Sequence, residues 1–160
     1  MIRSTIESET ELLKEIARGT LVFRPMEIHA LGEVLDDFHA LNRLQEHKAI
    51  TLEMDSQAIG FAYYAPTPMT DRTWHLYWIF VDKKSHAKGI GTEILNYVEQ
   101  DIIHMGGRLL VIETSSLPSY VPTRRFYLKH GYEQAATIRD FYTEGDDQVI
   151  FRKRLLPVTS

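Results

Sequence analysis

Cysteine is absent from this chain of 160 residues. Its absence excludes disulfide bonds, metal sites built from thiolates, and catalysis by a cysteine thiolate.

Long apolar runs and strong net charge are also missing. Residues 1–15 lack the apolar core of a signal peptide, and no window approaches the length of a membrane span. The net charge is −4, and the longest basic run is Arg152-Lys153-Arg154. A weakly acidic chain gives no electrostatic reason to bind nucleic acid or an anionic membrane. We therefore expect a cytoplasmic protein without a nucleic-acid or membrane partner.

The length and composition are those of an ordinary globular protein, and we expect a single domain over residues 1–160. Hydrophobic residues make up 44% of the chain and charged residues 25%. Apolar periodicity and turn residues predict the element order β-α-α-β-β-β-α-β-α-β-β. Residues 108–114 form a nearly continuous apolar run after a helix that stops at Gly106-Gly107, which predicts a strand-helix-strand unit with parallel strands. The expected fold class is α/β, with a mixed central sheet flanked by helices.

The most informative stretch covers residues 74–98. A run rich in β-formers, WHLYWIFVD, leads through KKSHAKGIG into a helix whose apolar residues recur at steps of three and four. The first N–H groups of a helix have no acceptor within it, and Gly89 and Gly91 let an anion approach the backbone. Lys83, Lys84 and Lys88 add positive charge. This pattern predicts a phosphate-binding turn at the start of the helix.

Two common nucleotide motifs do not fit this turn. The phosphate loop of nucleoside triphosphatases needs a lysine and a hydroxyl residue after its second glycine, but Thr92 and Glu93 follow Gly91. The dinucleotide fingerprint needs glycine or alanine where this chain has Ile94.

The segment His86-Ala87-Lys88-Gly89-Ile90-Gly91 resembles the acyl-CoA-binding motif of the GNAT superfamily of N-acetyltransferases, with His86 where the family has arginine or glutamine. A second phrase, Arg125-Phe126-Tyr127-Leu128-Lys129-His130-Gly131-Tyr132, is similar to the family's later motif. The family has the same order of elements, so the resemblance covers nearly the whole chain. It implies a GNAT-like fold and acetyl-CoA as co-substrate.

The resemblance also implies which residues hold the cofactor. The backbone N–H groups of residues 88–92 would bind the pyrophosphate, near His86 and the Thr92 hydroxyl. Exposed backbone of the central strand at Ile79 and Val81 would pair with the pantetheine arm, and the Ile79 N–H would polarise the thioester. The implied cofactor-binding residues are Ile79, Val81, His86, Lys88, Gly89, Ile90, Gly91 and Thr92.

Three residues are candidates for proton transfer. Along the central strand, His75 shares one face with Tyr77, Ile79 and Val81, and it falls where several family members carry a base. Imidazole titrates near neutral pH, although a histidine at the exposed start of a strand needs no such role. Glu113 is the rival base, because a carboxylate that ends an aliphatic strand is either salt-bridged or faces a substrate. By resemblance Tyr127 would protonate the departing thiolate, and its alternative role is that of a core aromatic residue.

The resulting hypothesis is an acyl-CoA-dependent N-acyltransferase that moves acetyl from acetyl-CoA to a primary amine of a small molecule, peptide or protein. Direct attack in a ternary complex is expected, because no cysteine exists to form an acyl-cysteine intermediate. The alternative is a non-catalytic domain of the same fold that senses acyl-CoA or another phosphorylated ligand. No histidine pair has ligand spacing, so no metal is expected. The resemblance makes a homodimer plausible. Acidic residues in the regions that build the family's acceptor cleft mildly favour a cationic acceptor, and a solvated helix face explains the same charges equally well. These residues are Glu27, Glu33, Asp36, Asp37, Asp140, Glu144, Asp146 and Asp147.

Overall fold

The elements follow one another in the predicted order. The computed structural model describes residues 1–155, apart from the side chains of residues 86–88, and within them it has an α/β fold with seven strands in one mixed sheet and four α-helices. The strands are β1 (Ile2–Ser4), β2 (Lys48–Met54), β3 (Gln57–Pro66), β4 (Thr73–Val81), β5 (Leu109–Ser115), β6 (Glu133–Thr143) and β7 (Asp146–Arg154). The helices are α1 (Thr10–Gly19), α2 (Pro25–Ala40), α3 (Ile90–His104) and α4 (Val121–Lys129), and a 3-10 helix, η3 (Lys83–Lys88), precedes α3.

The chain divides into two compact units. Unit 1 comprises Met1–Pro66 and Tyr77–Gln100, and unit 2 comprises Thr67–Leu76 and the segment that begins at Asp101. The division falls within β4 and within α3, so each of these elements starts in one unit and ends in the other. Hydrogen-bonded neighbours in the sheet follow the order β1-β2-β3-β4-β5-β7-β6.

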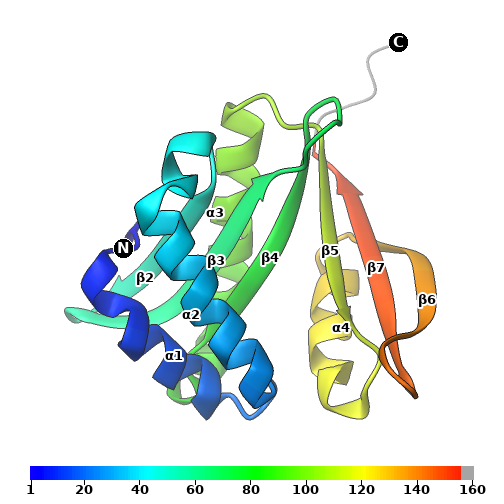
Figure 1. The fold of residues 1–160 in the computed structure, drawn as a ribbon, viewed down its shortest axis with the longest axis horizontal. Coiled ribbons are helices and arrows are strands. Elements are labelled where there is room, and N and C mark those ends of the chain that lie inside the picture. Colours follow the sequence, from blue (N-terminus) through cyan, green and yellow to red (C-terminus); the bar gives the residue numbers. More distant parts are fainter. Residues whose placement is uncertain (156–160) are drawn as a thin grey trace. The chain divides into compact units, whose positions relative to one another are not determined.

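Unit 1 is built by packing α1 and α2 on antiparallel strands (Figure 1). Proline at the first position of α2 fits the helical backbone angle and lacks only an N–H that would have no helical acceptor. The apolar positions of both helices recur at steps of three and four and enter one buried cluster with strand residues. Its members are Leu13, Ile16, Ala17, Ile28, Leu31, Leu35, Phe38, Ala49, Phe61, Tyr63 and Phe80.

Unit 2 contains the predicted parallel pair. The register runs from Thr73 opposite Leu109 to Leu76 opposite Ile112. Strand β5 then pairs antiparallel with β7, and β7 with β6. Leu110, Ile112 and Phe151 are buried in this unit.

Candidate active site

The turn between β4 and α3 has the geometry that the glycine pattern predicts. Asp82 follows β4, and its carboxylate accepts a hydrogen bond from the Lys84 N–H at 3.1 Å, which caps η3. Gly89 ends η3 with φ of +71°, a left-handed conformation that favours glycine, and a Cβ built there meets no atom within 4 Å. Helix α3 starts at Ile90, and the Glu93 N–H donates to the Gly89 carbonyl at 3.1 Å.

This turn offers backbone donors to an anion. In an α-helix the N–H groups before the first such bond have no acceptor within the helix, and α3 is long enough to carry a dipole. Gly89, Lys83 and Lys84 are exposed, so the approach is open and positively charged. The predicted side-chain contributions of His86 and Lys88 lie outside the described residues.

A close approach between α3 and β3 fixes the start of the helix. A Cβ on Gly60 would lie 2.5 Å from the Cδ1 atom of Ile94 and 3.6 Å from the Cγ2 atom of Ile90. Glycine at this point of β3 therefore lets the first turns of α3 rest directly on the strand. The packing of Ile90 and Ile94 on β3 thus holds the start of α3 in place, and with it the backbone N–H groups of the turn.

The second half of β4 shows the predicted alternation of side chains. Phe23 contacts both Trp78 and Phe80, with ring centroids 5.4 and 6.0 Å apart, so these two strand residues share one face. Ile79 and Val81 point to the opposite face, because side chains alternate along a strand. The Ile79 side chain is half-buried and that of Val81 is buried.

In unit 2 the structure brings the two rival bases together. The parallel register sets His75 opposite Val111, and Glu113 follows two residues later on the same face of β5. The His75 Nε2 atom lies 3.1 Å from the Glu113 Oε1 atom. The imidazole is 17% exposed and the carboxylate 39% exposed. The two candidates therefore form one hydrogen-bonded pair instead of two separate sites.

Two further side chains complete this polar cluster. The Thr67 Oγ1 atom lies 2.6 Å from the His75 Nδ1 atom, and the Gln148 side-chain amide donates to the Glu113 Oε2 atom at 3.0 Å. The hydrogen bond with His75 lowers the pKa of Glu113, against partial burial, which raises it, and the charge of His75 lowers it further. Glu113 is accordingly ionised at neutral pH. We call Thr67, His75, Glu113 and Gln148 the polar cluster.

Tyr127 lies in the core of unit 2. Its side chain is 4% exposed, and its ring contacts those of Phe126, Tyr132 and Phe151. Burial raises the pKa of its phenol above the usual range, because an apolar environment disfavours the phenolate. The phenol stays protonated through the physiological range.

Comparison with known proteins decides the family. The model of the GNAT acetyltransferase domain matches residues 45–134, which is more than half of the chain. The chain belongs to the GNAT acetyltransferases. A crystal structure of a protein assigned to this family, from Desulfovibrio desulfuricans, is 32% identical, covers 98% of this chain and 99% of its own, and superposes with a TM-score of 0.92.

Other relatives of this GNAT acetyltransferase act on different acceptors. The S-alkylcysteine N-acetyltransferase of Bacillus subtilis is 24% identical over 96% of this chain and 88% of its own. An aminoglycoside 6'-N-acetyltransferase complexed with coenzyme A is 18% identical, with a TM-score of 0.81 over 100% of this chain and 99% of its own, a likeness of fold alone.

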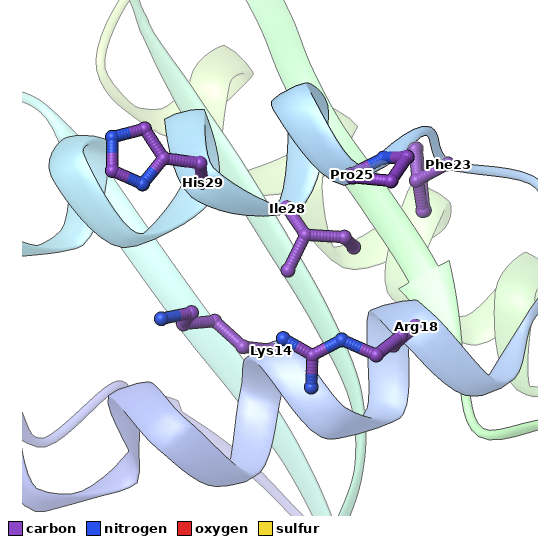
Figure 2. Close-up of a pocket in the computed structure, with 6 residues that line it drawn as sticks. All are labelled: Lys14, Arg18, Phe23, Pro25, Ile28 and His29. Carbon is purple, nitrogen blue, oxygen red and sulfur yellow. The ribbon is translucent and has the colours of Figure 1, made fainter.

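A surface hollow of about 250 Å³ lies between α1 and α2 of this GNAT acetyltransferase. Figure 2 shows Lys14 and Arg18 reaching from α1 toward the space beside Ile28 of α2. Phe23, Pro25 and His29 complete the lining. The aliphatic stem and ammonium of Lys14 pass 3.5 to 3.6 Å from the Cβ position of Gly32, so the lysine side chain lies along α2 at ordinary van der Waals distance. The lining of the hollow combines apolar side chains with basic ones.

Sequence reasoning missed four of these positions. Thr67 follows a proline at the end of β3, and Gln148 lies in β7, and neither belongs to a motif. Lys14 and Arg18 were detectable in principle, because residues four apart share one face of a helix. Among the side chains of residues 1–85 and 89–155, no three of histidine, aspartate or glutamate gather to hold a metal ion. None of the described helices has the length and hydropathy to cross a membrane.

Proposed function

We propose that this GNAT acetyltransferase transfers the acetyl group of acetyl-CoA to a primary amine by direct attack in a ternary complex. The observation that carries the proposal is the open left-handed turn at Gly89, followed directly by the start of α3. A pyrophosphate needs several N–H donors at one point, and a helix start after a glycine turn supplies them. The match to the family model covers this turn.

The cofactor roles are those that the resemblance to the family implies. Backbone N–H groups of residues 88–92 would bind the pyrophosphate, with the Thr92 hydroxyl and His86 nearby. The backbone of Ile79 and Val81 would pair with the amides of the pantetheine arm, and the Ile79 N–H would polarise the thioester carbonyl. Since the chain has no cysteine, the acetyl group passes to the amine without an acyl-cysteine.

The polar cluster would remove the proton that blocks the amine. An ammonium has no lone pair, so attack requires a base. The ionised Glu113 carboxylate would attract the ammonium, and the His75 imidazole beside it would accept the proton. Tyr127 would then give its phenolic proton to the departing thiolate or donate a hydrogen bond to it; burial raises the pKa of the phenol, which keeps the proton on the oxygen and favours the hydrogen bond.

Several of the acidic residues that favoured a cationic acceptor accept hydrogen bonds within the fold. Asp146 is fully buried, and its carboxylate accepts a hydrogen bond from the Ser115 hydroxyl. Glu27 accepts from the Arg24 N–H at the start of α2. Asp147 accepts from the Asp140 N–H in the β6-β7 hairpin. These contacts weaken the argument from acidity.

We propose instead that the acceptor carries a carboxylate and an apolar group beside its amine, as an S-alkylcysteine does. The hollow between α1 and α2 supports this acceptor class, because its lining includes the cations of Lys14 and Arg18 together with the apolar side chains of Phe23 and Ile28. Both cations pair with glutamates on α1, Glu11 and Glu15, that are 81% and 69% exposed. Exposed ion pairs are weak, so a ligand carboxylate could replace these partners at little cost.

Calorimetric titration of acetyl-CoA, CoA and ATP into the purified protein tests the cofactor site. We expect saturable binding of acetyl-CoA and CoA but not of ATP. Failure of both CoA species to bind would remove the basis of the proposal. Binding without turnover on a broad amine panel would favour the sensing domain.

The acceptor is tested by comparing S-methylcysteine, the amine left when its carboxylate is removed, and an aminoglycoside, with thiol release as the readout. We expect S-methylcysteine to give the highest kcat/KM and the variant Arg18→Gln to reduce that preference. Equal rates for the first two compounds would exclude a carboxylate site. A cytoplasmic location and a homodimer stay predictions, and sedimentation of the purified chain tests the second.

A further inference from the structure

The His75 imidazole is engaged at both ring nitrogens. Its Nδ1 atom lies 2.6 Å from the Thr67 hydroxyl oxygen, and its Nε2 atom lies 3.1 Å from the Glu113 carboxylate. The ring itself is 17% exposed. Both ring nitrogens therefore already have a hydrogen-bonding partner before an acceptor amine binds.

The two contacts define the tautomer. An ionised carboxylate can only accept a hydrogen bond, so the Nε2 atom carries the imidazole proton and donates a hydrogen bond to Glu113. In a neutral imidazole the other nitrogen then holds the lone pair. The Thr67 hydroxyl must therefore donate to the Nδ1 atom, which is the basic nitrogen of His75.

Thr67 is held in place by its own turn. Its N–H donates to the Thr73 carbonyl at 2.8 Å, and its carbonyl accepts from the Thr70 hydroxyl at 2.8 Å. The side chain of Thr67 is partly exposed. On the other side of the imidazole, the Gln148 amide holds one carboxylate oxygen of Glu113 while the other faces His75.

We propose that the Thr67 hydroxyl is the group through which His75 receives the proton of the acceptor amine, in a chain of hydroxyl, imidazole and carboxylate that Gln148 orients. One N–H bond of the ammonium breaks, and its proton passes to the Thr67 oxygen as the hydroxyl proton passes to the Nδ1 atom. The electron pair stays on the amine nitrogen and is free to attack. Glu113 remains ionised and stabilises the imidazolium. The inference rests on the proposed acetyl transfer.

The same arrangement of hydroxyl and imidazole also occurs where a hydroxyl acts as a nucleophile. In that case the Thr67 oxygen would attack the thioester and carry the acetyl group as an ester. Mass spectrometry after rapid acid quenching separates the two roles. Acetyl on Thr67 would overturn the relay, and an unmodified Thr67 during turnover is the expected result.

The kinetic test compares Thr67→Val, which keeps the shape and removes the hydroxyl, with Thr67→Ser, which restores it. Because positioned proton transfer contributes about 10²- to 10⁴-fold, we expect Thr67→Val to lose about 100-fold in kcat and Thr67→Ser to stay within about threefold of wild type. Thr137→Val makes the same change on an exposed strand residue that accepts from Gln134, and it should leave kcat unchanged.

The pH profile separates a proton relay from a merely structural role. As the pH rises toward the pKa of the acceptor amine, more acceptor arrives without the extra proton and needs no base. The ratio of wild-type to Thr67→Val rates should therefore fall with rising pH. A ratio that stays constant across the profile would assign Thr67 to structure alone and overturn the relay.

Nitrogen-15 NMR of the histidines checks the hydrogen bond without turnover, with His75→Gln used for assignment. The Nδ1 resonance of His75 should move in Thr67→Val and return in Thr67→Ser, and an unmoved resonance would contradict the proposal. If Thr67→Val turns over S-methylcysteine at the full wild-type rate, the relay is overturned and the proposed acetyl transfer stands. Absence of CoA binding in the wild type overturns the proposed function, and the relay falls with it.

Discussion

The turn before α3 and the polar cluster of unit 2 differ in what they are made of. The turn presents backbone N–H groups, and its shape depends on Gly89 in a left-handed conformation and on consecutive residues 82–93. The polar cluster consists of four side chains from the loop after β3 and from β4, β5 and β7. One region is local and uses the backbone, whereas the other is assembled by strand register.

This difference predicts opposite responses to substitution. The turn should tolerate changes of side chain wherever the backbone angles survive, but not changes that forbid a positive φ. The polar cluster should tolerate substitutions of neighbouring residues that leave the backbone in place. It should not tolerate the loss of one of its own charges or hydroxyls, because each polar group is the hydrogen-bonding partner of the next.

The largest expected effect on activity comes from substituting Glu113 of the polar cluster. We expect Glu113→Gln to lower kcat by about 100-fold or more, because an amide neither attracts the ammonium nor stabilises the imidazolium, while the affinity for CoA stays unchanged. Steady-state kinetics and calorimetry measure the two effects. Glu133→Gln, which removes an exposed carboxylate paired with Arg152 in the same unit, is the matched control. Weakened CoA binding in Glu113→Gln would show that the two regions are not independent.

Substitution of Tyr127 tests whether this buried tyrosine takes part in catalysis. Removing the phenolic oxygen in Tyr127→Phe should lower kcat by about tenfold, less than a typical loss of acid catalysis, because a thiolate leaves readily. The neighbouring buried residue gives the control Tyr132→Phe, and thermal unfolding checks that both variants keep their cores. An unchanged kcat in Tyr127→Phe would assign this tyrosine to packing.

The turn is tested by a change that forbids its backbone angle. In Gly89→Val a β-branched residue would have to adopt φ near +71°, at a cost of about 1–2 kcal/mol. We expect the dissociation constant of CoA to rise about tenfold, with the His75 NMR signals unchanged. Gly145→Val imposes the same strain at φ of +83° in the β6-β7 turn and should leave CoA binding intact. Equal loss of CoA binding in both variants would mean that general destabilisation is the cause.

The smallest effect concerns stability against acid. The pKa of Glu113 is lower in the folded chain than the ordinary value of 4.5, so the ionised carboxylate stabilises the fold above that pH. This stabilisation is lost as the pH falls through the folded pKa. Urea unfolding should show Glu113→Gln less stable than wild type at pH 6 by a few tenths of a kcal/mol, with a smaller difference well below pH 4.5. A difference that grows on acidification would reverse the assigned sign.

Prediction from the sequence was most successful where neighbours in the chain are neighbours in space. The periodicity of apolar residues and the positions of the glycines predict the strand, turn and helix over residues 73–104 and the order of all the elements. His75 and Glu113 were each nominated as the base, but as rivals. They are 38 residues apart in the sequence, and only the parallel register of β4 and β5 makes them partners.

The sequence by itself determined the family, the fold class and the glycine turn, because hydrophobic period and the positive φ of Gly89 act over a few consecutive residues. The tertiary structure alone decided that Asp146 is buried, and that Thr67 and Gln148 complete the pair of His75 and Glu113. Side chains that meet across strands depend on register and on alternation. No short motif records them, because the free energy that fixes the register comes from the whole buried face of the sheet.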